Sequence, residues 1–136
     1  MNRLATAASV LILSALVACT DSKKNLDPEP NIFPADYKQE ILDTLSRSLD
    51  DPTNVRGAFI SDPIVRTAEK DQRYTVCLRY NARDLSRQYI GSQDHIAYFF
   101  GGHLNQLVEA TPAQCGNAAY KPFPELEKLC LATKCN

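Results

Sequence analysis

Hydrophobic and polar positions repeat with two periods along this 136-residue chain, and the two periods predict a helix followed by strands. Over residues 35–50, apolar side chains recur at intervals of three to five positions, which predicts an amphipathic helix. The apolar stripe consists of Tyr37, Ile41, Leu42, Leu45 and Leu49. Pro34 suits the start of this helix. Asp51-Pro52 is expected to end it, because the residue before a proline disfavours helical geometry.

The clearest strand pattern lies at residues 73–80, where side chains alternate strictly between two faces. Tyr74, Val76, Leu78 and Tyr80 share one face, and Arg73, Thr75, Cys77 and Arg79 share the other. A disulfide partner must be able to reach Cys77, so we expect its face to be partly covered.

Two further segments complete the predicted sheet. Residues 57–66 predict an edge strand or a bulged strand, because Pro63 has no backbone donor. Residues 96–100 form a short apolar run that Gly101-Gly102 is expected to bend. Residues 103–109 fit either a helix or a strand, and we favour a strand that pairs back along residues 73–80.

A second helix is expected over about 123–132, with Pro124 in its first turn. The order helix, strands, helix predicts the α+β class. The expected fold is a small antiparallel three-stranded sheet, flanked by an N-terminal and a C-terminal helix and pinned by disulfides.

The N-terminal segment has the pattern of an export signal. Arg3 precedes an uninterrupted apolar or small run over residues 4–18, which is typical of a secretory signal peptide. The run is shorter than the roughly 20 residues that a spanning helix needs. It closes with Leu16-Val17-Ala18-Cys19, which resembles the lipobox of bacterial lipoproteins. Plain secretory cleavage after Ala18 is the alternative.

The resemblance implies that Cys19 carries acyl chains such as palmitate and becomes the first residue of the mature protein. Thr20 at the following position suggests the outer membrane, with the domain facing the periplasm or the outside. Residues 1–18 are then the signal peptide, 19–33 the lipidated cysteine and a flexible tether, and 34–136 a single globular domain. The partner that this implies is a membrane, through the N-terminal lipid.

The cysteine count agrees with export. Without Cys19, four cysteines remain: Cys77, Cys115, Cys130 and Cys135. An even number in an exported chain predicts two disulfides, which allow three connectivities. We favour Cys77 pairing with a cysteine of the C-terminal segment. A metal site is the disfavoured alternative, because the close Cys/His pairs typical of zinc ligands are missing from the sequence.

The densest polar stretch, residues 79–95, lies between two predicted strands and predicts an exposed loop. Its candidate binding residues are Arg79, Arg83, Arg87 and Tyr89, because arginine and tyrosine carry much of the energy at interfaces. The alternative interpretation is a solvated loop whose local ion pairs contribute little.

The sequence gives weaker evidence for a catalytic site than for a binding loop. His95 with Asp94, and His103, suggest acid–base chemistry, with Ser86 or Ser92 as the loop serine, but no nucleophile, metalloprotease or phosphate-loop motif accompanies them. The 15 basic and 16 acidic residues leave no basic excess that would favour nucleic acid. We therefore expect a non-catalytic binding module without a cofactor, whose partner is an envelope protein or polymer. The alternatives are a small inhibitor of an envelope-attacking enzyme and, less favoured, a small hydrolase.

Overall fold

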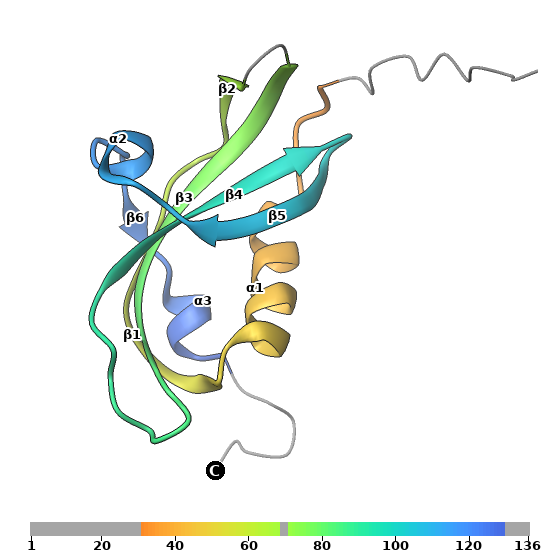
Figure 1. Ribbon diagram of the computed structural model, residues 1–136. Coiled ribbons are helices and arrows are strands. Elements are labelled where there is room, and N and C mark those ends of the chain that lie inside the picture. Colours follow the sequence, from red (N-terminus) through yellow and green to blue (C-terminus); the bar gives the residue numbers. More distant parts are fainter. Residues whose placement is uncertain (1–30, 69–70, 130–136) are drawn as a thin grey trace, which may run out of the picture.

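The computed structural model describes residues 31–68 and 71–129, and these residues fold around one antiparallel sheet (Figure 1). The helices are α1 (Tyr37–Ser48), α2 (Pro112–Cys115) and α3 (Pro124–Glu127). The strands are β1 (Asp51–Ile60), β2 (Ile64–Ala68), β3 (Asp71–Arg83), β4 (Gln93–Phe100), β5 (His103–Glu109) and β6 (Lys121–Pro122). No helix in the described ranges is long and apolar enough to cross a membrane.

The sheet has six strands, so the prediction of a three-stranded sheet with flanking helices is wrong. Its order is β5-β4-β3-β1-β6, and β2 also pairs with β3. β3 is the central strand: β4 lies along one edge, while β1 and β2 share the other. The sequence understated the sheet because β1 begins directly after α1 and β6 has only two residues, so neither shows a clean alternating pattern.

The single edge or bulged strand predicted over residues 57–66 is instead the end of β1 and the start of β2, which both pair with β3 and leave Pro63 in the gap between them. Ile60 lies opposite Leu78 and Ile64 lies opposite Thr75. Between them, the backbone N–H of Ser61 donates to the Cys77 carbonyl at 2.9 Å. The Ser61 hydroxyl in turn accepts a hydrogen bond from the Cys77 N–H, also at 2.9 Å.

Two irregularities bend β1, and they explain why the sequence predicted only residues 57–60 of this strand. Asn54 and Gly57 both have positive φ, at 59° and 57°, and the pairing with β3 shifts around each of them. Bulges of this kind increase local twist and disturb alternation. The N–H of Ala58 is satisfied by the Glu127 carboxylate of α3, at 3.0 Å.

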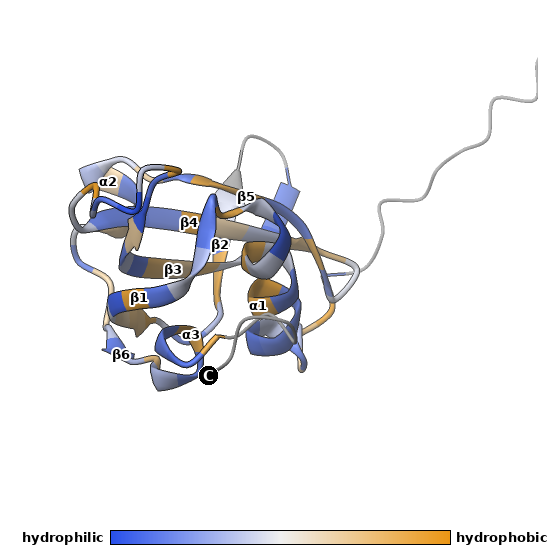
Figure 2. Cartoon of the chain, turned by 90° about the horizontal axis from the view of Figure 1, so that it is seen from below, coloured by the Kyte–Doolittle hydropathy of each residue, from blue (hydrophilic) through white to orange (hydrophobic). Residues whose placement is uncertain are grey.

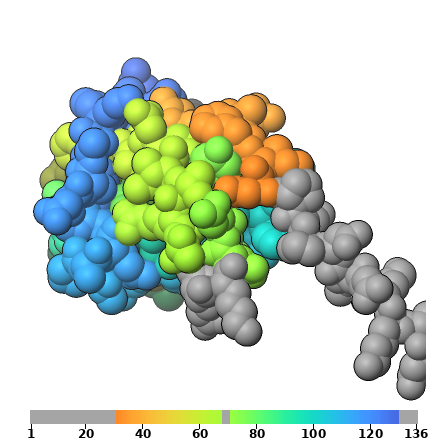
Figure 3. Space-filling view, turned by 90° about the horizontal axis from the view of Figure 1, so that it is seen from above, coloured from red at the N-terminus to blue at the C-terminus, as the bar shows by residue number. Residues whose placement is uncertain are grey.

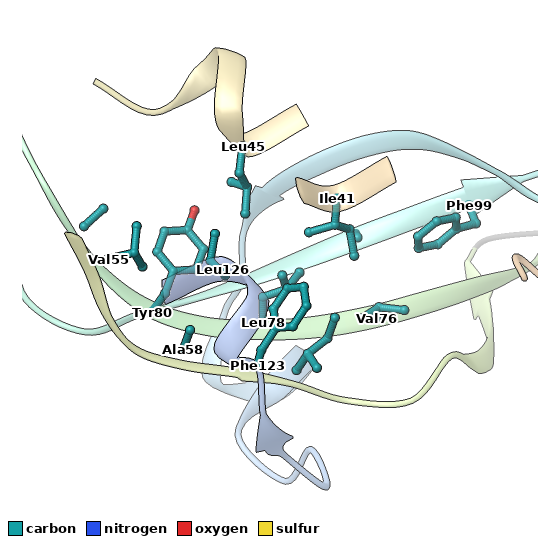
Figure 4. Packing of buried hydrophobic residues seen from close by; sticks show 13 residues of the cluster. Ile41, Leu45, Val55, Ala58, Val76, Leu78, Tyr80, Phe99, Phe123 and Leu126 are labelled. Carbon is teal, nitrogen blue, oxygen red and sulfur yellow. The ribbon is translucent and has the colours of Figure 1, made fainter. Parts of the chain in front are cut away.

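The main core lies between the sheet and the two helices α1 and α3, on the side called here the inner face (Figures 2 and 4). Ile41 and Leu45 of α1 point to the sheet and are fully buried, which confirms the predicted helical stripe. Phe123 and Leu126 close the core from the C-terminal side. Val76, Leu78 and Tyr80 of β3 all face this core, as their alternation predicted.

The C-terminal helix is much shorter than predicted. α3 starts at Pro124, as expected, but covers only one turn, and Lys128 already leaves helical order. A single turn suffices to bury Phe123 and Leu126 completely, so the local pattern overstated the helix. The predicted residues 130–132 lie outside the described residues.

The opposite side of the sheet, called here the outer face, is covered by the chain around α2. A disulfide joins Cys77 of β3 to Cys115 of α2. Together with Ile96, these cysteines form a small second core, against which Tyr98, Val108 and Tyr120 pack. The expected covering of the Cys77 face is therefore confirmed, and one predicted disulfide is present.

Residues 103–109 form a strand, but its predicted partner is wrong. β5 pairs with β4 and does not reach β3. Gly101 and Gly102 both have positive φ, at 56° and 84°. Two such residues reverse the chain within a tight hairpin turn. Both edges of β3 are already occupied by β1, β2 and β4.

Candidate functional site

The predicted recognition segment, residues 79–95, is mostly strand. β3 continues to Arg83 and β4 begins at Gln93, so the connection is limited to residues 84–92, called here the β3–β4 loop. Of the four candidate residues, Arg79 and Arg83 belong to a strand, whereas Arg87 and Tyr89 belong to the loop. Arg83 nevertheless lies beside both loop residues, because it lines an open cleft together with Arg87 and forms a backbone bridge with Tyr89. Arg79 is not among the residues that line this cleft.

Arg79 is held by an ion pair across the sheet. It lies opposite Asp94 on β4, and its Nε and Nη2 atoms are 2.6 and 3.0 Å from the two carboxylate oxygens. The Tyr120 hydroxyl donates to the same carboxylate at 3.1 Å, and the guanidinium lies 4.6 Å from the Tyr120 ring centroid. These hydrogen bonds, above all the one from Arg79, lower the pKa of Asp94. Arg79 thus ties β3, β4 and the C-terminal segment together.

Arg83, the last residue of β3, also forms an ion pair across the sheet, in this case with β1. Its Nη2 atom is 2.6 Å from Asp51 at the start of β1. Thr53 also binds Asp51, with its N–H at 3.0 Å and its hydroxyl at 2.6 Å. The Thr53 hydrogen bond is the main reason that the pKa of Asp51 is lowered. Arg83 thus reaches Asp51 through Nη2, while its Nε atom is buried without a hydrogen-bond partner among the described residues.

Tyr89 fastens the β3–β4 loop to β1. Its hydroxyl donates to the Asn54 carbonyl at 2.8 Å, and the Arg56 guanidinium lies 4.3 Å from its ring centroid. A backbone bridge to Arg83 holds the residue from the strand side. Tyr89 therefore holds the loop against β1. The sequence suggested a role in binding only because tyrosine is common at interfaces.

The tip of the loop is a compact turn that presents Leu85 and Arg87 to solvent. The Asp84 N–H donates to the Gln88 carbonyl at 2.9 Å, and the Asp84 carboxylate accepts from the Gln88 N–H at 3.0 Å. Arg87 has a positive φ of 62° and is exposed. Leu85 is 82% exposed, the highest value among the exposed large hydrophobic residues of the described chain. Of the four predicted residues, Arg87 is thus the one displayed at the tip.

An open cleft of about 550 Å³ lies between this tip and the start of β1. Carboxylates from Asp50, Asp51 and Asp84 line it together with Arg83 and Arg87, and Leu85 stands at its border. The sequence did not indicate the contribution of residues 50–54, because they reach the loop only through the bulged pairing of β1 with β3. Leu85 could have been found as an apolar residue in a polar loop.

Asp94 and His95 are not brought together. Consecutive strand residues point to opposite faces: Asp94 binds Arg79 and Tyr120 on the outer side, while the His95 ring stacks on Tyr80 of the inner core at 4.5 Å. Burial lowers the pKa of His95. Ser86 and Ser92 lie in the β3–β4 loop. Within residues 31–68 and 71–129, no group of three or more His, Cys, Asp or Glu is placed to hold a metal ion.

No protein-family model, no curated protein and no solved structure matches this chain. Cys19, Cys130 and Cys135 lie outside the described residues, so their predicted roles stay predictions.

Proposed function

We propose that this protein is a lipid-anchored envelope protein that acts as a non-catalytic binding module and contacts its partner through the tip of the β3–β4 loop. The lipobox-like Leu16-Val17-Ala18-Cys19 supports the anchor at the outer membrane. The Cys77–Cys115 disulfide supports export, because disulfides persist in oxidising compartments. The partner class is an envelope protein or polymer.

One observation carries the choice of surface: an almost fully exposed leucine stands beside an exposed arginine on a braced turn. Leu85 offers apolar surface whose removal from water would favour binding. Arg87 offers a guanidinium, a group that is enriched where interfaces carry most of their energy. Tyr89 and the Asp84–Gln88 hydrogen bonds fix the turn before binding. A pre-ordered loop loses less conformational entropy when it docks.

The same rigid, protruding turn also supports the second candidate, an inhibitor of an envelope-attacking enzyme. An inhibitor of this kind inserts a fixed loop into a cleft of the enzyme, and Leu85 would be the inserted side chain. Addition of the protein to lysozyme and protease assays tests this candidate. A loss of enzyme activity that Leu85→Ser abolishes supports it, and full enzyme activity at micromolar protein contradicts it.

The binding proposal is tested by cross-linking in intact envelopes followed by affinity purification of the detergent-solubilised protein. The test variant is Leu85→Ser/Arg87→Glu, which leaves Arg79 and Arg83 in their ion pairs. The matched control is Arg47→Glu, an exposed arginine in the last turn of α1. We expect several-fold lower partner recovery with the loop variant and normal recovery with the control. Equal recovery with both variants removes the loop from the proposal.

A further inference from the structure

The residues before α1, strand β2 and the end of β4 lie at the end of the fold opposite the β3–β4 loop (Figure 1), and all three carry exposed apolar side chains. Between 38% and 53% of the surface of each of these residues remains exposed, although all are large and apolar. The set is Ile32, Phe33, Ile64, Val65 and Phe100, and it is called here the upper patch. Figure 3 views the molecule from this end.

The upper patch is an ordered surface. The Phe33 ring packs edge-on against Tyr74, with centroids 5.4 Å apart, and Val65 lies directly opposite Tyr74. Ile32 lies against Gly102 so closely that a Cβ there would be 3.0 Å from its Cγ2 atom. The residues that precede α1 are thus packed onto the β4–β5 turn, which unites the three segments.

Two arginines beside the patch lie directly opposite each other in the sheet, which is unfavourable for two like charges. They are Arg66 of β2 and Arg73 of β3, and both project from the outer face. Like Nε of Arg83, the Nε atoms of both are buried without a hydrogen-bond partner among the described residues. The Nη2 atom of Arg66 lies 3.9 Å from Cys77 Sγ. Asp71 lies 3.7 Å from Arg73, which leaves a single near carboxylate for two guanidinium groups in the described part of the chain.

Arg73 also links the charge to the apolar surface, because its guanidinium lies 5.2 Å from the centroid of the exposed Phe100 ring. Aromatic rings beside arginines suit the boundary between lipid headgroups and acyl chains. Phosphate oxygens of lipid headgroups are acceptors of the kind that guanidinium groups bind well.

We propose that the upper patch docks on the surface of the bilayer that holds the anchor. In this orientation, Arg66 and Arg73 bind anionic phospholipid headgroups, while Phe33, Val65 and Phe100 enter the headgroup boundary. The inference rests on the proposed function, since the anchor supplies the membrane. Residues 20–30 span at most roughly 40 Å, and the described fold begins at Asn31, which immediately precedes two residues of the patch.

Docking in this way directs the β3–β4 loop away from the membrane, because the two features lie at opposite ends of the sheet (Figure 1). The lipid would therefore orient the domain as well as retain it. The loop would therefore contact its partner on the side of the domain that faces away from the bilayer. The length of the sheet would determine how far from the bilayer this contact lies.

The absence of tryptophan from the sequence permits a direct test. The mature lipidated chain is reconstituted into vesicles with brominated acyl chains, with and without phosphatidylglycerol. Phe100→Trp places one indole in the upper patch, and Leu85→Trp places one at the opposite end as the matched control. We expect strong bromine quenching at position 100 in the anionic vesicles and little at position 85. Equal quenching at the two positions contradicts docking.

The arginines are tested in the Phe100→Trp background. We expect each change, Arg66→Gln or Arg73→Gln, to lower the ratio of docked to undocked protein about fivefold, because a basic residue near an anionic surface contributes about 1 kcal/mol. Arg47→Gln/Lys128→Gln removes two exposed charges elsewhere and should leave quenching unchanged. Quenching that rises with protein density instead shows self-association through the patch and overturns the proposal.

Failure of this inference can be told apart from failure of the proposed function. Flotation of the chain with vesicles after a high-salt wash reports the anchor, and partner recovery with the Leu85→Ser/Arg87→Glu variant reports the loop. A chain that floats but shows equal quenching at both positions contradicts docking alone. A chain that does not float contradicts the anchor, and with it the docking that depends on the anchor.

Discussion

The Ser61 hydroxyl takes the place of a backbone carbonyl toward Cys77. It accepts the hydrogen bond of the Cys77 N–H at 2.9 Å, at the point where Asp62-Pro63 interrupts the strand. Both residues are buried, with 6% and 2% of their surfaces exposed. A buried N–H without a partner is costly, so this serine allows β1 and β2 to pair with β3 on either side of a proline.

Ser61→Ala should therefore destabilise the domain by about 1–3 kcal/mol, because it leaves the Cys77 N–H buried without an acceptor. Urea unfolding followed by circular dichroism measures the free energy of unfolding. Ser48→Ala, at an exposed position at the end of α1, is the control and should change it little. Equal free energies of unfolding for the wild type and Ser61→Ala would show that the hydroxyl is dispensable.

The disulfide should contribute a large part of the stability. It closes a loop with a sequence separation of 38 residues, for which chain entropy predicts about 4 kcal/mol. Cys77→Ala/Cys115→Ala should lower the free energy of unfolding by an amount of this order. Non-reducing peptide mapping of the wild type should recover Cys77 linked to Cys115. If this pair is found, the second predicted disulfide can join only Cys130 and Cys135. An intact mass that shows four free thiols would contradict both disulfides.

Acid should weaken the outer face through Asp94. Hydrogen bonds from Arg79 and Tyr120 lower its pKa in the folded state below 3.8. The stabilisation is then complete above pH 3.8 and is lost as the pH falls through the folded pKa. Asp94→Asn should cost about 1 kcal/mol at pH 7, and it should flatten the loss of stability below pH 3.8. An unchanged acid limb in this variant would exclude Asp94 as its source.

His95 should impose a second pH dependence, in a higher range. Burial lowers its pKa below 6.5 in the folded protein, so the unfolded chain binds the proton first. Stability should therefore fall as the pH drops below 6.5, by at most about 1.4 kcal/mol per pH unit. His95→Phe keeps a ring on Tyr80 and should remove this slope, whereas His103→Gln should retain it. Urea midpoints at pH 7 and pH 5 decide between these outcomes.

The sequence predicted the elements whose pattern is local. The stripe of α1 and the alternation of β3 follow from side-chain periodicity, and the structure has both. Only residues 57–60 of β1 lay within a predicted strand, because the bulges at Asn54 and Gly57 disturb the alternation of its other residues. The pairing of β5 was predicted wrongly, because Gly101-Gly102 was expected only to bend or bulge a strand. In the structure these residues form a tight turn, which returns the chain to pair with β4.

In the candidate site, too, the sequence predicted what is local and missed what depends on strand pairing. Residue type correctly marked Arg87 as an exposed cation, but it could not reveal that Asp94 and Asp51 engage Arg79 and Arg83. Those partners are brought into place by strand register. The apolar Leu85, which a search for charged and aromatic residues overlooked, is the most exposed of the large apolar side chains that the structure describes.

The proposed anchor at Cys19 can be examined by mass spectrometry of the mature N-terminus. The protein is isolated from envelope membranes and digested, and its N-terminal peptide is sequenced. We expect this peptide to begin at Cys19 and to carry acyl chains, and we expect Cys19→Ala to release the protein from the membrane fraction. A mature protein that begins at an unmodified Cys19, or one that retains residues 1–18, would show that Cys19 is not the anchor.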